Sequence, residues 1–238
     1  MKKHSFLSYI FWTAVAVLTG ITISSATTMA AKTAHRYIAS AGMTFVYIAE
    51  RLPDSVIEKA EIKKPSLSAE GYLVADIQTG EIILAKNKTK QFPIASITKL
   101  MTALVSLETI DQSQIAIVPL EALVGENPSI KGLSEGEVLS TSSLLYPLLL
   151  ESSNAAAKTL ADHIGTKNFV NYMNGKADSV GLSNTYFADS SGLSSRNIST
   201  PEDLFKLVSY LFKNKKQILE ITRKKEFEEG MKKWANGD

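Results

Sequence analysis

The sequence contains no cysteine, which excludes disulfide bonds, thiolate metal sites and cysteine nucleophiles. It has only three histidines, His4, His35 and His163, and their isolated positions favour packing or capping over catalysis or metal binding. The H-E-x-x-H pattern, the P-loop and the Rossmann fingerprint are absent as well. These absences remove the common metal, nucleotide and thiol chemistries.

An excess of charge of either sign is also missing. The chain has 26 Lys and Arg against 24 Asp and Glu, and because Lys2 and Lys3 account for the difference, residues 32–238 are balanced. Residues 32–238, with almost no net charge, lack the excess of positive charge that is typical of a nucleic-acid-binding protein. We therefore expect no nucleic-acid partner.

What is present is the composition of an ordinary folded protein. The 238 residues are 45% hydrophobic and 21% charged, which is typical of neither disordered nor fibrous chains. The length is sufficient for one domain with a sizeable core and some appendages.

The amino terminus has the pattern of an export signal. Residues 1–4 are basic, and residues 6–23 form an uncharged apolar run of 18 residues. Because this length is near the lower limit for crossing a bilayer, residues 1–31 are predicted to be a signal peptide or a membrane anchor, with a buried core helix as a third interpretation. In the first two cases the rest of the chain is exported, to the periplasm or the outer face of the cytoplasmic membrane.

Residues 32–65 are predicted to link this segment to the main domain. The apolar stretch at 37–49 has 13 residues and is too short to span a membrane, so we expect a short packed helix or a segment lying on the membrane surface. Residues 58–66 are charged, contain Pro65 and resemble a linker. We place the main domain at 66–238.

Within the main domain, a β-hairpin precedes a mostly helical region, which predicts an α+β fold. Two strand-like runs, 71–76 and 81–86, flank a turn that contains Gly80. Apolar residues at helical spacing predict helices over 96–109, 144–150, 155–163, 167–180 and 201–213. Pro147 lies early in the second of these, and Ser199-Thr200 is the predicted cap of the last. The highly charged stretch 213–233 is predicted to be a solvated helix.

Candidate chemistry begins with an S-x-x-K pattern, Ser96 and Lys99, at the start of a buried helix. Residues three apart share a helix face, so the Lys99 amine can approach the Ser96 hydroxyl. A hydroxyl becomes a strong nucleophile when a base takes its proton, and a lysine with a lowered pKa is such a base. The backbone N–H of residue 96, near the helix N-terminus, is a candidate donor to an oxyanion.

A second pattern, Ser152-x-Asn154, follows the leucine-rich helix. Taken alone, Ser152 and Asn154 are also good helix caps. Together and in this order, the two patterns resemble the penicillin-recognising serine enzymes, and the surroundings resemble the serine D-alanyl-D-alanine carboxypeptidases, or low-molecular-mass penicillin-binding proteins. The supporting segments are residues 75–80, 93–102, 169–174, 181–187, 192–193 and 199–204.

The resemblance implies a β-lactamase/transpeptidase-like domain and a role for each site residue. Ser96 is implied to be the acylated nucleophile, Lys99 its base, Ser152 a proton relay to the leaving amine, and Asn154 the group that holds the substrate backbone amide. The implied substrate is the peptidoglycan stem peptide, with β-lactams as inhibitors and with no metal or cofactor.

One family pattern is missing, because no K-T-G follows Asn154. In the family this triplet lies on a strand that binds the substrate carboxylate and supplies the second oxyanion N–H. Gln78-Thr79-Gly80 resembles it but falls in the first hairpin. We therefore expect missing C-terminal sheet strands, an open sheet edge, an apolar face and an incomplete domain.

Two alternatives remain open, and the first of them follows from the missing triplet. The chain could be a truncated or non-catalytic relative that binds peptidoglycan or a cell-wall partner. It could also be a serine β-lactamase, although the deacylating glutamate of an E-x-x-L-N pattern is not found after Asn154.

Overall fold

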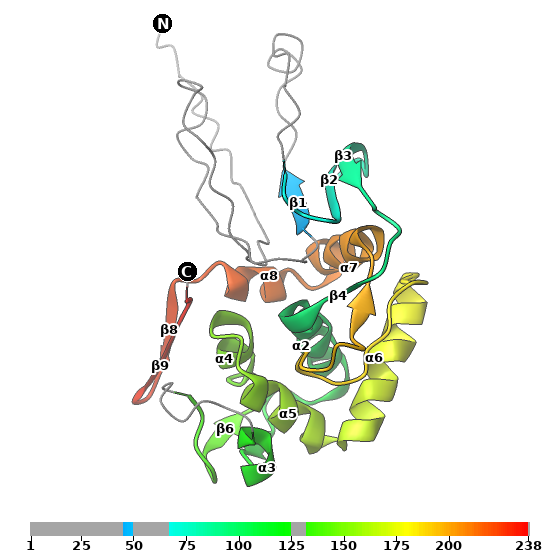
Figure 1. Cartoon of the computed structure of the whole chain (residues 1–238). Coiled ribbons are helices and arrows are strands. Elements are labelled where there is room, and N and C mark those ends of the chain that lie inside the picture. Colours follow the sequence, from blue (N-terminus) through cyan, green and yellow to red (C-terminus); the bar gives the residue numbers. More distant parts are fainter. Residues whose placement is uncertain (1–44, 50–66, 125–131, 238) are drawn as a thin grey trace, which may run out of the picture.

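The computed structural model describes residues 45–49, 67–124 and 132–237, with residues 45–49 described as backbone only (Figure 1). The predicted export segment, 1–31, and most of the linker lie outside these residues. The described elements confirm an α+β fold. In chain order they are β1 (Phe45–Ala49), β2 (Tyr72–Asp76), β3 (Ile82–Lys86), β4 (Phe92–Pro93), η1 (Ala95–Ile97), α2 (Thr98–Thr109), β5 (Ile115–Ile117), α3 (Leu120–Leu123), β6 (Val138–Ser140), α4 (Leu145–Leu150), α5 (Asn154–His163), α6 (Thr166–Val180), β7 (Ile198–Ser199), α7 (Pro201–Asn214), α8 (Lys216–Thr222), β8 (Glu226–Glu229) and β9 (Lys232–Ala235).

The predicted hairpin is confirmed as β2 and β3, which pair antiparallel. The Asp76 side chain accepts hydrogen bonds from the N–H groups of Gln78 and Thr79, and Gly80 takes the positive φ that the turn requires. β3 is an edge of the three-stranded sheet, and its Ile83 is 61% exposed. Among the described residues, no strand pairs with the outer side of β3.

The other edge of this sheet corrects one prediction. Residues 45–49, within the stretch predicted to be a short helix, form β1, which pairs parallel to β2 from Phe45–Tyr72 to Ala49–Asp76. Alternating and continuous apolar runs of this length do not distinguish a strand from a buried helix. Pairing with β2 is a tertiary effect that the local sequence does not encode.

The core is built around α2, which lies among α4, α5 and α6 (Figure 1). Every residue from Thr98 to Ser106 is buried, so this part of the helix is covered on all sides by its neighbours. The predicted helices around it are confirmed as α4, α5, α6 and α7, with bounds within two residues of those expected. In α7 the Thr200 side chain accepts from the Asp203 N–H, and Pro201 occupies the first position, as its sequence predicts.

The charged stretch after α7 also differs from its prediction. Instead of one solvated helix, it forms the short helix α8 and the hairpin β8–β9. The alternation of charged residues with Phe227 and Trp234 places both rings on one face, where Tyr146 of α4 stacks on Phe227 and Trp234 is 2% exposed. This hairpin therefore packs on α4, and in the described residues it does not join the β1–β2–β3 sheet.

Two further properties concern only the described residues. Their helices are all too short or too polar to span a lipid bilayer. They also contain no cluster of three His, Cys, Asp or Glu side chains that could bind a metal ion.

Candidate active site

Ser96 lies in a tight turn rather than in the α-helix itself. The turn is η1, a 3₁₀ helix that continues directly into α2. The Ile94 N–H donates to the Asn197 carbonyl and fixes the entry to the turn. As a result, Ser96 is exposed at the surface, whereas Lys99, one turn later, is only 3% exposed.

The Lys99 amine joins three segments that are distant in the sequence. Its Nζ lies 3.1 Å from Ser96 Oγ, 2.8 Å from Asn154 Oδ1 and 2.7 Å from the Ser191 carbonyl oxygen. The structure therefore brings Ser96, Lys99 and Asn154 together, as the helical spacing and the second pattern predict.

The chemistry of these three partners differs. The Asn154 and Ser191 oxygens can only accept hydrogen bonds, whereas the Ser96 hydroxyl can also donate one. A neutral amine has two N–H bonds and one lone pair. When the two N–H bonds point to Asn154 and Ser191, the lone pair faces the Ser96 hydroxyl, which is the arrangement that a general base requires.

The second pattern is placed at the turn between α4 and α5. The cap of α5 is Ser153, whose side chain accepts from the Ala156 N–H at 3.1 Å. The capping role that the sequence allows for Ser152 and Asn154 is therefore filled by their neighbour. Ser152 is exposed on the turn, and Asn154 is the first residue of the helix.

Backbone strain is concentrated at these two segments. Among the described residues, three that are not glycine have a positive φ: Asn87 (48°), Ala95 (44°) and Ser152 (55°). Such conformations cost on the order of 1–3 kcal/mol each and persist where the surrounding structure enforces them, often at active sites. Ala95 precedes Ser96 directly, and Ser152 is itself a predicted site residue.

A loop that carries none of the predicted site residues also contributes to the surroundings of Lys99. It comprises residues 189–194 and contributes the Ser191 carbonyl. A Cβ atom built on Gly192 would lie 1.9 Å from the Ala95 carbonyl oxygen, so the two backbones are in direct contact. Asp-Ser-Ser-Gly is a good turn sequence, but nothing in it indicates which carbonyl faces a distant lysine.

Two carboxyl groups near the candidate site have shifted pKa values. Burial opposes ionisation of Asp189, but hydrogen bonds from the N–H groups of Ser194, Gly192 and Ser191 outweigh it, so that the pKa of this carboxyl lies below its ordinary value. Burial raises the pKa of Glu151, next to Ser152, and the Ala235 N–H and the Lys232 charge only partly offset this effect. Glu151 thus connects the Ser152 turn to β9.

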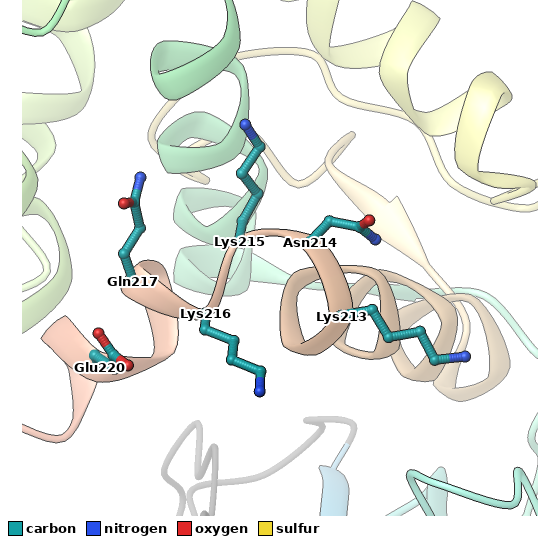
Figure 2. Close-up of a pocket in the computed structure, with 6 residues that line it drawn as sticks. All are labelled: Lys213, Asn214, Lys215, Lys216, Gln217 and Glu220. Atoms are coloured by element: carbon teal, nitrogen blue, oxygen red, sulfur yellow. The ribbon is translucent and has the colours of Figure 1, made fainter.

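A hollow of about 510 Å³ lies elsewhere, where α7 meets α8. Its lining residues are Lys213, Asn214, Lys215, Lys216, Gln217 and Glu220. Figure 2 shows that Lys215 and Lys216 point to opposite sides of the chain, so their charges do not converge on one ligand. The hollow contains none of the predicted site residues.

Comparison with known proteins identifies the family. The sequence pattern of the family described as D-alanyl-D-alanine carboxypeptidase matches residues 58–237, which is most of the chain. This chain belongs to the D-alanyl-D-alanine carboxypeptidase family. The resemblance noted in the sequence is thereby confirmed.

Individual relatives and solved structures agree with this assignment. A D-alanyl-D-alanine endopeptidase of Escherichia coli K12 is 35% identical over 155 residues, which cover 61% of this chain and 48% of that protein. The crystal structure of a D-alanyl-D-alanine carboxypeptidase from Mycobacterium tuberculosis H37Rv has a TM-score of 0.67 at 26% identity, covering 76% of this chain and 70% of that chain. A variant of the Streptomyces K15 DD-transpeptidase has a TM-score of 0.66 at 29% identity, covering 74% and 76%. The chain spans about half the length of three curated D-alanyl-D-alanine endopeptidases that it matches.

Proposed function

We propose that this chain is an exported serine peptidase that cleaves the D-Ala-D-Ala end of peptidoglycan stem peptides through an acyl-enzyme on Ser96. The observation that carries the proposal is the position of Lys99 Nζ, within hydrogen-bonding distance of Ser96, Asn154 and Ser191. Membership of the D-alanyl-D-alanine carboxypeptidase family supports the substrate class.

In the proposed acylation, neutral Lys99 takes the proton of the Ser96 hydroxyl while Oγ attacks the carbonyl carbon of the penultimate D-Ala. The carbonyl oxygen becomes an oxyanion, and the Ser96 N–H is a candidate donor to it. The C–N bond then breaks, and a proton returns through Ser152 to the leaving nitrogen, which departs as the amine of D-Ala. The acyl group remains as an ester on Ser96 until water hydrolyses it.

Asn154 has a second role in this proposal. Its Oδ1 accepts from Lys99, which leaves the Nδ2 group facing other partners, and an amide N–H donates well to a peptide carbonyl. The Nδ2 group therefore holds the backbone of the stem peptide beside Ser96. A β-lactam presents a similar amide carbonyl and acylates the same oxygen.

The export part of the proposal rests on residues 1–31. A basic start followed by an uncharged run of 18 residues directs a chain across the cytoplasmic membrane, either with cleavage or with retention as an anchor. Peptidoglycan lies on that side of the membrane, in the periplasm or at the outer face. The substrate and the predicted location therefore agree.

A second candidate, endopeptidase activity, is favoured by the names of three relatives. Three D-alanyl-D-alanine endopeptidases are 35%, 36% and 40% identical to this chain over about 150 residues. The chemistry at Ser96 is the same in both activities. The difference is the leaving amine, which is free D-Ala for a carboxypeptidase and the side chain of a neighbouring stem peptide for an endopeptidase.

Incubation of the full chain, in detergent, with two purified substrates separates these candidates. We expect a stem pentapeptide to lose its terminal D-Ala, as detected by liquid chromatography and mass spectrometry, and we expect prior treatment with penicillin to block the loss. Cleavage of cross-linked muropeptide dimers with an intact pentapeptide would instead establish the endopeptidase. A folded protein that binds but cleaves neither substrate is the non-catalytic relative, and the proposal then fails.

A further inference from the structure

The Asp189 carboxylate is the centre of the 189–194 loop. Its Oδ1 accepts from the Ser191 N–H at 2.8 Å, the Ser191 hydroxyl at 3.0 Å and the Gly192 N–H at 2.6 Å. Its Oδ2 accepts from the Ser194 N–H at 2.7 Å. One side chain therefore determines the course of most of the loop.

The peptide group between Ser191 and Gly192 transmits this restraint to Lys99. In a planar trans peptide, the N–H and the C=O point in opposite directions. The N–H end of this group donates to Asp189, and the C=O end accepts from Lys99 at 2.7 Å. Carboxylate, peptide and amine thus form a continuous chain of hydrogen bonds, in which each bond polarises the next.

The loop is also fixed to the helices on which the site is built. The Thr102 hydroxyl of α2 donates to the Ser190 carbonyl at 2.6 Å, and the Ser190 hydroxyl donates to the Ala157 carbonyl of α5 at 3.0 Å. The direct contact of Gly192 with Ala95 adds a third point. The Ser191 carbonyl consequently has little freedom to move relative to Ser96.

We propose that Asp189 is a positioning residue, which acts through the Ser191–Gly192 peptide to hold the Lys99 amine with its lone pair toward Ser96. This inference rests on the proposed function, because it gives Lys99 the role of base. With the Ser191 carbonyl in place, one N–H of Lys99 is committed to it and a second to Asn154. Without that carbonyl, the amine can rotate and present an N–H to Ser96.

The carboxylate form is essential to this arrangement. The pKa of Asp189 lies below its ordinary value because its backbone donors outweigh its burial, so the group is ionised at neutral pH. In Asp189→Asn, an NH₂ group replaces one acceptor oxygen and faces backbone N–H donors. One side of the loop then loses its hydrogen bonds, whichever way the amide is turned.

The test compares the full chain with Asp189→Asn in two measurements. The first is the second-order rate constant of acylation by a fluorescent penicillin, which we expect to fall about 10- to 100-fold, because a displacement of a catalytic group by about 1 Å has effects of this size. Asp178→Asn is the matched control, since it removes the same charge from an exposed position of α6, and its rate is expected to remain unchanged. An unaltered rate in Asp189→Asn overturns the proposal.

The second measurement does not require any reaction. The ¹³Cε chemical shift of Lys99 at pH 7, in protein with labelled lysine, is expected to change in Asp189→Asn and to stay constant in the Asp178→Asn control. If the unmodified chain is not acylated, the proposed function fails, and this shift alone decides the positioning role. If the Lys99 chemical shift in Asp189→Asn equals that in Asp178→Asn, the positioning role of Asp189 is overturned.

Ser191→Ala provides a milder second variant if Asp189→Asn does not fold. It removes one of the four donors to Asp189 and leaves the backbone donors in place. We expect a fall in acylation rate of about threefold and a Lys99 shift change in the same direction. The absence of both effects contradicts the proposal.

Discussion

Ser96→Ala is expected to form no covalent adduct with penicillin. In the proposed mechanism the adduct is an ester on Ser96 Oγ, and Lys99, the proposed base, has its amine 3.1 Å from this oxygen. Because Ser96 is exposed, the alanine leaves the packing of α2 intact. Intact-mass spectrometry and fluorescent-penicillin labelling of the full chain measure the loss, which we expect to exceed about 1,000-fold in rate.

Ser183→Ala is the control for this substitution, because Ser183 is also an exposed serine but lies outside the candidate site. It is expected to be labelled like the unmodified chain. Persistent labelling of Ser96→Ala would show that another residue is the nucleophile, with Ser152 the next to be replaced.

Gly192→Ala is expected to reduce both stability and acylation. Its Cβ would lie 1.9 Å from the Ala95 carbonyl oxygen, and the φ of +88° is unfavourable for any residue with a side chain. We expect the left-handed backbone to cost about 1–2 kcal/mol and the overlap to cost about 1–3 kcal/mol more in the free energy of unfolding. Relief of the overlap displaces Ala95 and therefore Ser96, so the acylation rate is expected to fall about 100-fold.

Gly181→Ala separates the two contributions to stability. Gly181 ends α6 with a φ of +78°, and a Cβ there meets nothing within 4 Å. This variant should therefore lose only the backbone contribution, about 1 kcal/mol, and should acylate normally. Equal losses of stability in the two glycine variants, measured by urea unfolding, would show that the contact of Gly192 with Ala95 is not tight.

Much of the helical part could be predicted from the sequence because its signals are local. The apolar spacing of α2, the Thr200 cap and the hairpin turn at Gly80 all act within a few residues, and the structure contains each of them. The approach of Lys99 to Ser96 is of the same kind, since residues three apart share a helix face. Local geometry was therefore sufficient for the first half of the candidate site.

The remainder depends on contacts between distant segments. The hydrogen bond between the Ser191 carbonyl and Lys99 could not be predicted, because a backbone oxygen has no sequence signature and its partner is 92 residues away. Ser152 and Ser153 are neighbours of the same type, and only the structure shows that Ser153 is the cap. In the β8–β9 hairpin, the many charged residues favoured the prediction of a solvated helix. The packing of Phe227 and Trp234 on α4 was therefore not predicted.

The hydrogen bonds of Lys99 also have a consequence for folding. Three of its hydrogen-bond partners lie 3, 55 and 92 residues away in the sequence, so the last two of these contacts form only after long chain loops have closed. An intermediate that has formed α2 but has not docked the 189–194 loop contains Ser96 and Lys99 without the arrangement that we propose activates them. Fluorescent penicillin added during refolding is therefore expected to label only molecules in which this loop has docked. The helical circular-dichroism signal is expected to appear earlier than the labelling. The delay between the two signals measures how late the loop docks.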